Sequence, residues 1–403
     1  MAALNASAPQ EYCPLLKSML NQSLDTNVTP MLVSILGLVS CVGILENALI
    51  LWVLGFRLRR KTVAAIWVIN LAMSDFLATL TLPLFTHYLH KQHSWELGRP
   101  LCSIYASIFF LNMFVSAFLL AAISLDRCML ITRPVWSQNH RSVAAAWKIC
   151  AIGWSWAAFN SFPYFFFRDV TLREDKRNLC YHNFALYSAP GRLASDCQVR
   201  QTATAVSKFL LAFVFPLAVI AASYIHFGIS LRARNRRRQR ENSGTFLSSS
   251  GGSVALSSLS ASSGRAGSAG LSRSFTKMVV TVITAFILCW APYHVLCLME
   301  VVVSAERLEL VEKVLPMATT FSFLNPILNP VLYAFSSPHF FTRFRQNIFS
   351  LLEGLVDEGN TMSLAGGILR RKTGRKKSHA DVNSPTMPSS PDTGSINRFP
   401  FPP

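Results

Sequence analysis

Charged residues are scarce in this chain of 403 residues. Asp, Glu, Lys and Arg together make up 14% of it, against about a quarter in soluble globular domains. Hydrophobic residues make up 51%, and the charges stand mostly outside long apolar runs. This distribution excludes an ordinary soluble domain and is typical of a protein that crosses a membrane several times.

The motifs of several membrane-protein classes are also missing. No HExxH, GxSxG or paired-carboxylate pattern stands in an apolar run, which argues against a membrane enzyme. The chain shows no internal repeat, which argues against a secondary transporter, so a transporter or channel is only a distant alternative. The middle of the last apolar run contains no lysine, which a retinal protein would need.

Seven apolar runs are each long enough to cross a bilayer as a helix, which takes about 18 residues or more. They are predicted at 31–56, 62–89, 100–132, 142–166, 203–231, 274–303 and 311–336. The sequence therefore predicts an all-α membrane protein, a seven-transmembrane helix bundle. An odd number of spans places the two ends of the chain on opposite sides of the membrane.

The net charge of +18 is mostly a topology signal. Basic clusters follow the first and fifth runs and precede the fourth, all on one side, which the positive-inside rule makes cytoplasmic. A nucleic-acid partner is disfavoured because these clusters flank membrane spans. Residues 1–30 are then an extracellular segment, and they carry glycosylation sequons at Asn5, Asn21 and Asn27.

The rest of the chain divides by composition. Residues 31–337 form the membrane domain, in which the Ser- and Gly-rich third cytoplasmic loop, 236–272, is predicted to be disordered. Residues 338–352 are predicted to form a short amphipathic cytoplasmic helix that lies on the membrane lipids of the inner leaflet. Residues 353–403 are predicted to be a disordered cytoplasmic tail.

Polar residues recur inside the apolar runs, where each is costly unless it is paired or solvated. Asp75 is the only acid of its run. Asn112 and Ser116 stand one helical turn apart in the third run, and Asn325 and Asn329 do so in the seventh. Together they could form an oxygen-rich cavity for water and a small hard cation. Interhelical hydrogen bonding alone is the alternative.

Three other landmarks suggest helices that change their packing. Prolines in the seventh run, including Pro330, free backbone carbonyls that polar neighbours or water must satisfy. Asp126 and Arg127 end the third run, where the guanidinium can exchange the adjacent carboxylate for other partners, although a simple snorkelling pair is the alternative. Trp290 stands beside a kink at Pro292, which can couple a cavity to helix tilt.

Two basic residues stand near the extracellular ends of spans. Lys208 lies just inside the fifth run, where a lone ammonium needs an anionic partner, and Arg168 lies just past the fourth. Both could instead mark the membrane boundary. Large apolar side chains would line a pocket beside them: Phe109, Phe110, Met113, Trp290 and Tyr293. Cationic anchors above an apolar lining suit an amphiphilic carboxylate.

Taken in order along the chain, these landmarks resemble those of the rhodopsin-like G-protein-coupled receptors over nearly its whole length. The matching residues are Asn47, Asp75, Cys102, 126–128, Trp154, Pro216, Tyr224, Phe286, 289–292 and 329–333. The resemblance implies a disulfide between Cys102 and Cys180 and a sodium site headed by Asp75. It implies an active-state switch at Asp126, Arg127, Tyr224, Trp290, Asn329, Pro330 and Tyr333.

Two positions depart from the pattern of that family. Residue 272 is Ser272, where an acid often locks the arginine in the inactive state. Pro326 occupies a place where the sodium site often has a serine. No cofactor is expected apart from an allosteric sodium ion.

Several stretches look more closely like the chemoattractant-type prostaglandin D2 receptors, over roughly residues 40–235 and 275–340. They include 93–98, 108–114, 133–141, 167–169 and 206–210. This resemblance implies a plasma-membrane receptor for prostaglandin D2 or a related anionic lipid, which signals through the inhibitory class of heterotrimeric G protein in chemotactic responses. The tail serines and threonines suggest an arrestin partner. A chemoattractant receptor for a peptide or another acidic ligand is the alternative.

The closer resemblance also implies roles for residues. Arg168, Lys208 and Tyr293 would bind the acid, and a second disulfide would join Cys13 to Cys197. Two pocket positions depart from the pattern. His182 stands where those receptors have a tyrosine, and Tyr105 stands where they have a histidine.

Overall fold

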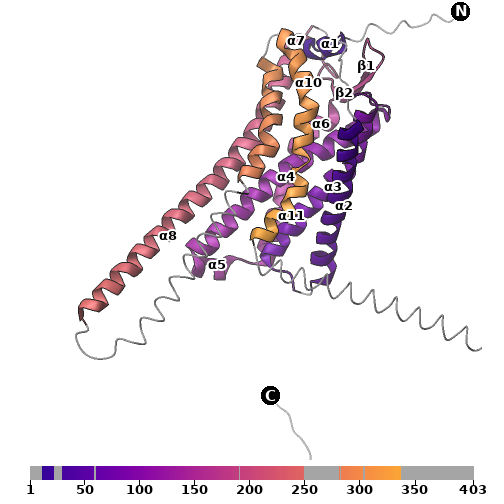
Figure 1. Ribbon diagram of the computed structural model, residues 1–403. Coiled ribbons are helices and arrows are strands. Elements are labelled where there is room, and N and C mark those ends of the chain that lie inside the picture. Colours follow the sequence, from indigo (N-terminus) through magenta and orange to yellow (C-terminus); the bar gives the residue numbers. More distant parts are fainter. Residues whose placement is uncertain are drawn as a thin grey trace, which may run out of the picture. The chain divides into compact units, whose positions relative to one another are not determined.

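The computed structural model describes residues 11–21, 30–58, 60–189, 191–248, 281, 283–302 and 305–336. Within them the fold is a set of long helices and one short antiparallel hairpin (Figure 1). The predicted amphipathic helix 338–352, the tail 353–403 and the sequons at Asn5 and Asn27 lie outside the described residues. Asn21 is the last residue of α1.

The first four predicted spans are helical close to their predicted bounds. They are α2 (Pro30–Trp52), which a π-helical segment η1 (Val53–Arg57) continues, α3 (Val63–His90), α4 (Gly98–Thr132) and α6 (Val143–Phe166). Side-chain oxygens cap the first turns of two of these helices. Thr62 accepts from the Ala65 amide at 3.2 Å at the start of α3, and Ser142 caps α6 in the same way.

The fifth span is longer than predicted in both directions. It consists of α7 (Leu193–Ser207), the π-helical segment η2 (Lys208–Val214) and α8 (Phe215–Ser248). The prediction of disorder from residue 236 is therefore wrong as far as 248, since the backbone is helical there. The arginines, glutamine and glutamate of this stretch are good helix formers, and they outweigh its low hydrophobicity.

The last two spans contain breaks. The sixth is the helix Ile283–Val302. The seventh is divided into α10 (Ala305–Ser322) and α11 (Asn325–Ser336). The break falls where Pro326 has no N–H to donate to the carbonyl of Ser322, so the α-helical hydrogen-bond ladder is interrupted.

Within the described residues, five helices are long and apolar enough to cross a membrane. They are Pro30–Arg57, Val63–His90, Gly98–Leu130, Leu193–Arg234 and Ile283–Val302. α6 and the α10–α11 segment fall below this standard, because they carry more polar residues or are short. α3 and α4 are buried over most of their length, which makes them the central helices. α3 packs on α2 and α4, α4 packs on α6 and α8, and α11 packs on α2 and α3.

Three elements were not predicted from the sequence. A short helix α1 (Pro14–Asn21) contacts α10 and the hairpin, and α5 (Pro134–His140) begins at a proline after α4. The hairpin pairs β1 (Arg168–Leu172) with β2 (Asn178–His182), with Arg168 directly opposite His182. Their segments are short or polar, so a search for long apolar runs cannot find them.

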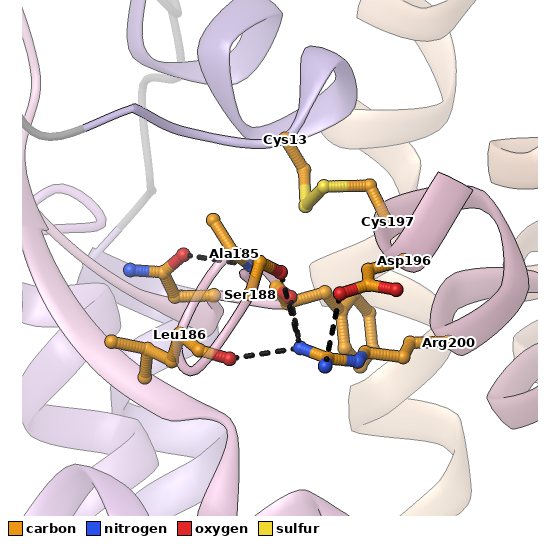
Figure 2. The surroundings of a disulfide bond; sticks show 9 residues. Cys13, Ala185, Leu186, Ser188, Asp196, Cys197 and Arg200 are labelled. Atoms are coloured by element: carbon orange, nitrogen blue, oxygen red, sulfur yellow. Dashed lines mark hydrogen bonds and ion pairs between the residues drawn. A yellow bond between two sulfur atoms is a disulfide. The ribbon is translucent and has the colours of Figure 1, made fainter. Parts of the chain in front are cut away.

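Both expected disulfides are present. Cys102–Cys180 fastens the hairpin to the start of α4, and Cys13–Cys197 fastens the segment before α1 to α7. Figure 2 shows the second bond beside Arg200 of α7, whose guanidinium donates to the carbonyl of Leu186 at 2.8 Å. We call this end of the bundle the disulfide end.

Candidate functional site

A cavity opens at the disulfide end of the bundle. It encloses an empty volume of about 1060 Å³, which includes space open to solvent. Seven of the predicted ligand residues line it: Tyr105, Phe109, Phe110, Arg168, His182, Lys208 and Tyr293. Met113 and Trp290, also predicted to line it, are buried in the helix core and are not among its lining residues.

Arg168 and His182 form a paired donor group in this cavity. The register of the hairpin puts them opposite each other, and Arg168 Nη1 lies 3.1 Å from His182 Nε2. Burial, and then the charges of Arg168 and Lys208, hold the pKa of His182 well below its ordinary value. The imidazole is therefore neutral, and since Nε2 accepts from Arg168, its proton is on Nδ1. His182 Nδ1 and Arg168 Nε are both buried without a hydrogen-bond partner among the described residues.

Lys208 is buried, at 6% exposed, in the π-helical segment η2. Its ammonium lies over the rings of Phe110, Tyr164 and Tyr293, at 5.4, 5.6 and 5.7 Å from their centroids. It forms no ion pair with any carboxylate in the part of the chain that the structure describes. Aromatic faces offset only part of the cost of burying a charge. An anion in the cavity would therefore stabilise this ammonium further.

Two carboxylates of the cavity were missed in the sequence. Glu300 accepts a hydrogen bond from the hydroxyl of Tyr181 at 2.8 Å, and Glu312 lies on α10. Burial, and then the charge of Glu300, raise the pKa of Tyr181 well above its ordinary value, so its phenol stays protonated and donates. Glu300 stands inside a predicted span, and an acid in a span is itself a signal of function that could have found it.

Asp75 is fully buried and receives hydrogen bonds from two other helices. Asn329 of α11 donates to Oδ2 at 2.7 Å, and Asn112 and Ser116 of α4 donate to Oδ1 at 3.0 and 3.3 Å. Asn325 makes no hydrogen bond to Asp75, and its Nδ2 has no partner among the described residues. The predicted cluster thus forms apart from Asn325. The oxygens of a carboxylate, a hydroxyl and the unpartnered Asn329 Oδ1 fit a small hard cation.

A side chain of α2 satisfies a carbonyl that a proline frees. Pro330 has no N–H to donate to the carbonyl of Pro326, one turn earlier. Asn47 Nδ2 donates to that carbonyl instead, at 3.2 Å. The expectation that polar neighbours satisfy the carbonyls freed by prolines is confirmed here.

Three of the predicted switch residues, Asp126, Arg127 and Tyr224, lie at the opposite end of the bundle from the cavity. The Asp126 carboxylate is bound by both arms of Arg141, at 2.8 and 2.9 Å, and not by the adjacent Arg127. The hydroxyl of Tyr224, on α8, lies 3.4 Å from that of Ser124. Tyr333 belongs to α11, but its side chain is outside the described residues.

Trp290 lies between the cavity and the interior of the bundle. Its ring centroid is 6.1 Å from that of Phe109 and 6.4 Å from that of Tyr293, both of which line the cavity. Pro292 stands in the same helix, and Ser322 of α10 donates to the nearby carbonyl of Cys289 at 3.2 Å. A molecule that enters the cavity and displaces Phe109 or Tyr293 would therefore press on Trp290.

Comparisons with known proteins bear on the whole chain. Residues 46–333 match the model of the 7 transmembrane receptor (rhodopsin family). The chain is 41% identical over 368 residues to prostaglandin D2 receptor 2 of Mus musculus, covering 89% of this chain and 87% of that protein. It is 34% identical to chemerin-like receptor 1 of Rattus norvegicus, covering 81% and 80% of the two chains. It is 32% identical to C5a anaphylatoxin chemotactic receptor 1 of Homo sapiens, covering 80% and 81%.

The family match spans most of the chain, and the relatives are receptors and not enzymes. It also supplies the spans that hydropathy alone leaves weak, α6 and the α10–α11 segment, since the family has seven. The chain is therefore a multi-pass membrane protein that belongs to the rhodopsin family of seven-transmembrane receptors, a G-protein-coupled receptor of the chemoattractant type.

Proposed function

We propose that the receptor binds an anionic lipid mediator, prostaglandin D2 or a related acid, in the cavity at the disulfide end. The observation that carries this proposal is a set of buried cavity donors: Arg168 Nε and His182 Nδ1 have no hydrogen-bond partner among the described residues, and the Lys208 ammonium forms no ion pair there. Charge-assisted hydrogen bonds to a carboxylate are among the strongest available to such groups. The similarity to prostaglandin D2 receptor 2 supports the same ligand class.

The apolar part of the ligand would lie against aromatic rings. Tyr105, Phe109, Phe110 and Tyr293 line the cavity next to the donors. An acyl chain against these rings gains from burial, at about 25 cal/mol per Å² of apolar surface removed from water. The names of other relatives, chemerin-like and C5a receptors, keep a peptide or another acidic ligand as the second candidate.

The orientation and the partners follow from the same proposal. The disulfide end faces the outside of the plasma membrane, with residues 1–30 extracellular and glycosylated, and the basic end of the bundle faces the cytosol. Residues 31–337 form the receptor domain, 338–352 an amphipathic helix and 353–403 a cytoplasmic tail. An inhibitory-class G protein binds the cytoplasmic end, and the tail binds arrestin after phosphorylation.

Activation would couple the two ends through Trp290. An agonist that displaces Phe109 or Tyr293 presses on Trp290, and its helix then swings about Pro292. This movement opens a cytoplasmic cleft beside Arg127 and Tyr224, with Tyr333 turning in from α11, where a helix of the G protein inserts. Agonist and G protein both prefer the open state, so each tightens the binding of the other.

A sodium ion would oppose this change. Asp75, Ser116, Asn112 and Asn329 would hold it, with water in the remaining positions. The bound ion supplies positive charge that compensates the buried carboxylate and favours the closed packing of α3, α4 and α11. The hydrogen bonds of Asp75 with Asn112, Ser116 and Asn329 also stabilise this packing, since they tie the three helices together.

Binding of tritiated prostaglandin D2 to membranes tests the ligand proposal. Lys208→Ala and Arg168→Ala should each weaken it about 10–150-fold, since a hydrogen bond to a charged group contributes about 1.5–3 kcal/mol. Arg99→Ala is the matched control, because Arg99 pairs with Asp169 near the cavity but does not line it. Unchanged affinity for prostaglandin D2 and for other lipid acids in both variants, with normal surface expression, would overturn the proposal.

A further inference from the structure

Glu312 is a buried acceptor that the structure leaves unsatisfied. Its side chain lines the cavity from α10, the residue is 8% exposed, and neither carboxylate oxygen has a hydrogen-bond partner among the described residues. A buried charged group without a partner is costly, because it has lost the water that would otherwise solvate it. A group that enters the cavity and donates a hydrogen bond to Glu312 removes that cost.

The other polar groups around Glu312 are already engaged. Glu300, the second acid of the cavity, accepts from the Tyr181 hydroxyl at 2.8 Å. Arg173 also lines the cavity, and its Nε forms an ion pair with the Asp175 carboxylate at 3.7 Å. Glu312 is therefore the carboxylate of the described cavity residues that still requires a donor.

The cavity thus contains both unsatisfied hydrogen-bond donors and an unsatisfied acceptor. On one side Arg168 Nε and His182 Nδ1 have no acceptor among the described residues, and the Lys208 ammonium forms no ion pair with a carboxylate there. On α10 is an acceptor without a donor, Glu312. A simple fatty acid would satisfy only the first group and would leave Glu312 buried and unpaired.

We propose that Glu312 selects among acidic lipids by accepting a hydrogen bond from a hydroxyl that the ligand carries away from its carboxylate. This inference rests on the proposed function and names a determinant of specificity within it. Hydroxylated lipid acids then bind well, and their deoxy counterparts bind poorly because they leave the carboxylate desolvated and unpaired.

The test compares prostaglandin D2 with analogues in which one of its hydroxyls is replaced by hydrogen, which removes the donor without adding bulk. In the wild-type receptor at least one deoxy analogue should bind about 10-fold or more weakly. In Glu312→Ala that ratio should fall towards one, partly because the deoxy analogue binds more tightly than it does to wild type. Glu312→Gln keeps an acceptor oxygen and should keep part of the ratio.

Glu309→Ala is the matched control. Glu309 lies one turn earlier on α10, its side chain is half exposed, and it pairs with Lys313 at 2.7 Å, so the wild-type ratio should persist. A ratio that is unchanged in Glu312→Ala, with binding still dependent on Lys208, would overturn this inference and leave the proposed function standing. Absence of any binding of lipid acids to the wild-type receptor would instead overturn the proposed function.

A third outcome would reassign the chemistry of the site. If an analogue with an amine in place of the hydroxyl binds wild type more tightly than prostaglandin D2, and Glu312→Gln abolishes that gain, the carboxylate recognises a cation. That result would overturn the hydroxyl assignment. Surface expression and thermal unfolding of every variant are measured in parallel, since removal of an unpaired buried carboxylate should not destabilise the fold.

Discussion

The Asp126 carboxylate is bound by the guanidinium of Arg141, through Nε at 2.8 Å and Nη2 at 2.9 Å, while the adjacent Arg127 makes no hydrogen bond to it. Arg141 lies between α5 and α6, so this bidentate pair ties the segment after α5 to the end of α4. The pair also occupies the carboxylate that could otherwise hold Arg127. It therefore leaves Arg127 available to another partner.

Arg141→Ala should lower agonist-stimulated nucleotide exchange on the G protein without changing agonist affinity at the cavity. The freed Asp126 carboxylate can then pair with Arg127 and hold it away from the G protein. The double variant Asp126→Asn with Arg141→Ala should recover exchange, because no carboxylate remains to hold Arg127. Lys148→Ala, at an exposed position of α6, is the control. Exchange that is equally low in the single and double variants would refute this explanation.

Sodium should lower agonist affinity through Asp75. Raising sodium chloride, with an impermeant organic salt as the ionic-strength control, should weaken agonist binding in wild type several-fold, since allosteric couplings are typically about 1–3 kcal/mol. In Asp75→Asn the ion loses its charged ligand, and the effect should disappear. Agonist competition curves at several sodium concentrations measure this. Equal sodium sensitivity in both proteins would remove the ion from the mechanism and leave the receptor assignment intact.

Loss of the Cys13–Cys197 bond should loosen the wall of the cavity. The bond fastens α1, and Met19 of α1 lines the cavity. In the double variant Cys13→Ser with Cys197→Ser, the free energy of unfolding should fall by about 2–4 kcal/mol. The variant should also bind ligand more weakly. Cys41→Ser, at an exposed free cysteine of α2, is the control. Thermal unfolding of the solubilised receptor that is unchanged by the double variant would show that α1 is held without the bond.

Stability should fall in mild acid because of His182. Its folded-state pKa lies well below the ordinary value, so the unfolded chain binds more protons once the pH drops below about 6.5. By about pH 5 this costs roughly 2 kcal/mol for a histidine that stays neutral when folded. Burial also lowers the pKa of His93 to about 4, which adds to the trend.

His182→Gln keeps an acceptor for Arg168 and cannot titrate, so its melting temperature should fall less than that of wild type between about pH 7 and pH 5. His90→Gln, at an exposed position at the end of α3, should keep the wild-type dependence on pH. Parallel curves for wild type and His182→Gln would assign the acid sensitivity to other groups.

Local sequence signals located the spans and their ends well. Long apolar runs located α2, α3 and α4 and the weaker α6, because each depends only on the residues within it. The same local logic failed after residue 236, where polar but helix-forming arginines extend α8. It also missed the hairpin, whose strands are too short for a periodic pattern to show.

The residues of the candidate site could be predicted from the sequence only in part. Arg168, Lys208 and the Asp75 cluster were found because a charge in or beside an apolar span is unusual wherever the rest of the chain lies. Met113 and Trp290 were misplaced in the cavity, because which face of a helix borders a cavity depends on how its neighbours pack. Glu312 was missed because it stands at the edge of the predicted seventh run, between Glu309 and Lys313, where a charge usually faces water.

By itself the sequence determined the class of the protein, the number of spans, their order and the polar landmarks within them, since each of these is a property of a short segment and its transfer into lipid. Only the tertiary structure decided the pairings: Asp126 with Arg141 and not with Arg127, Asn329 and not Asn325 with Asp75, and Glu312 with no partner in the described residues. These outcomes depend on distances between helices far apart in the chain, which arise when the helices pack.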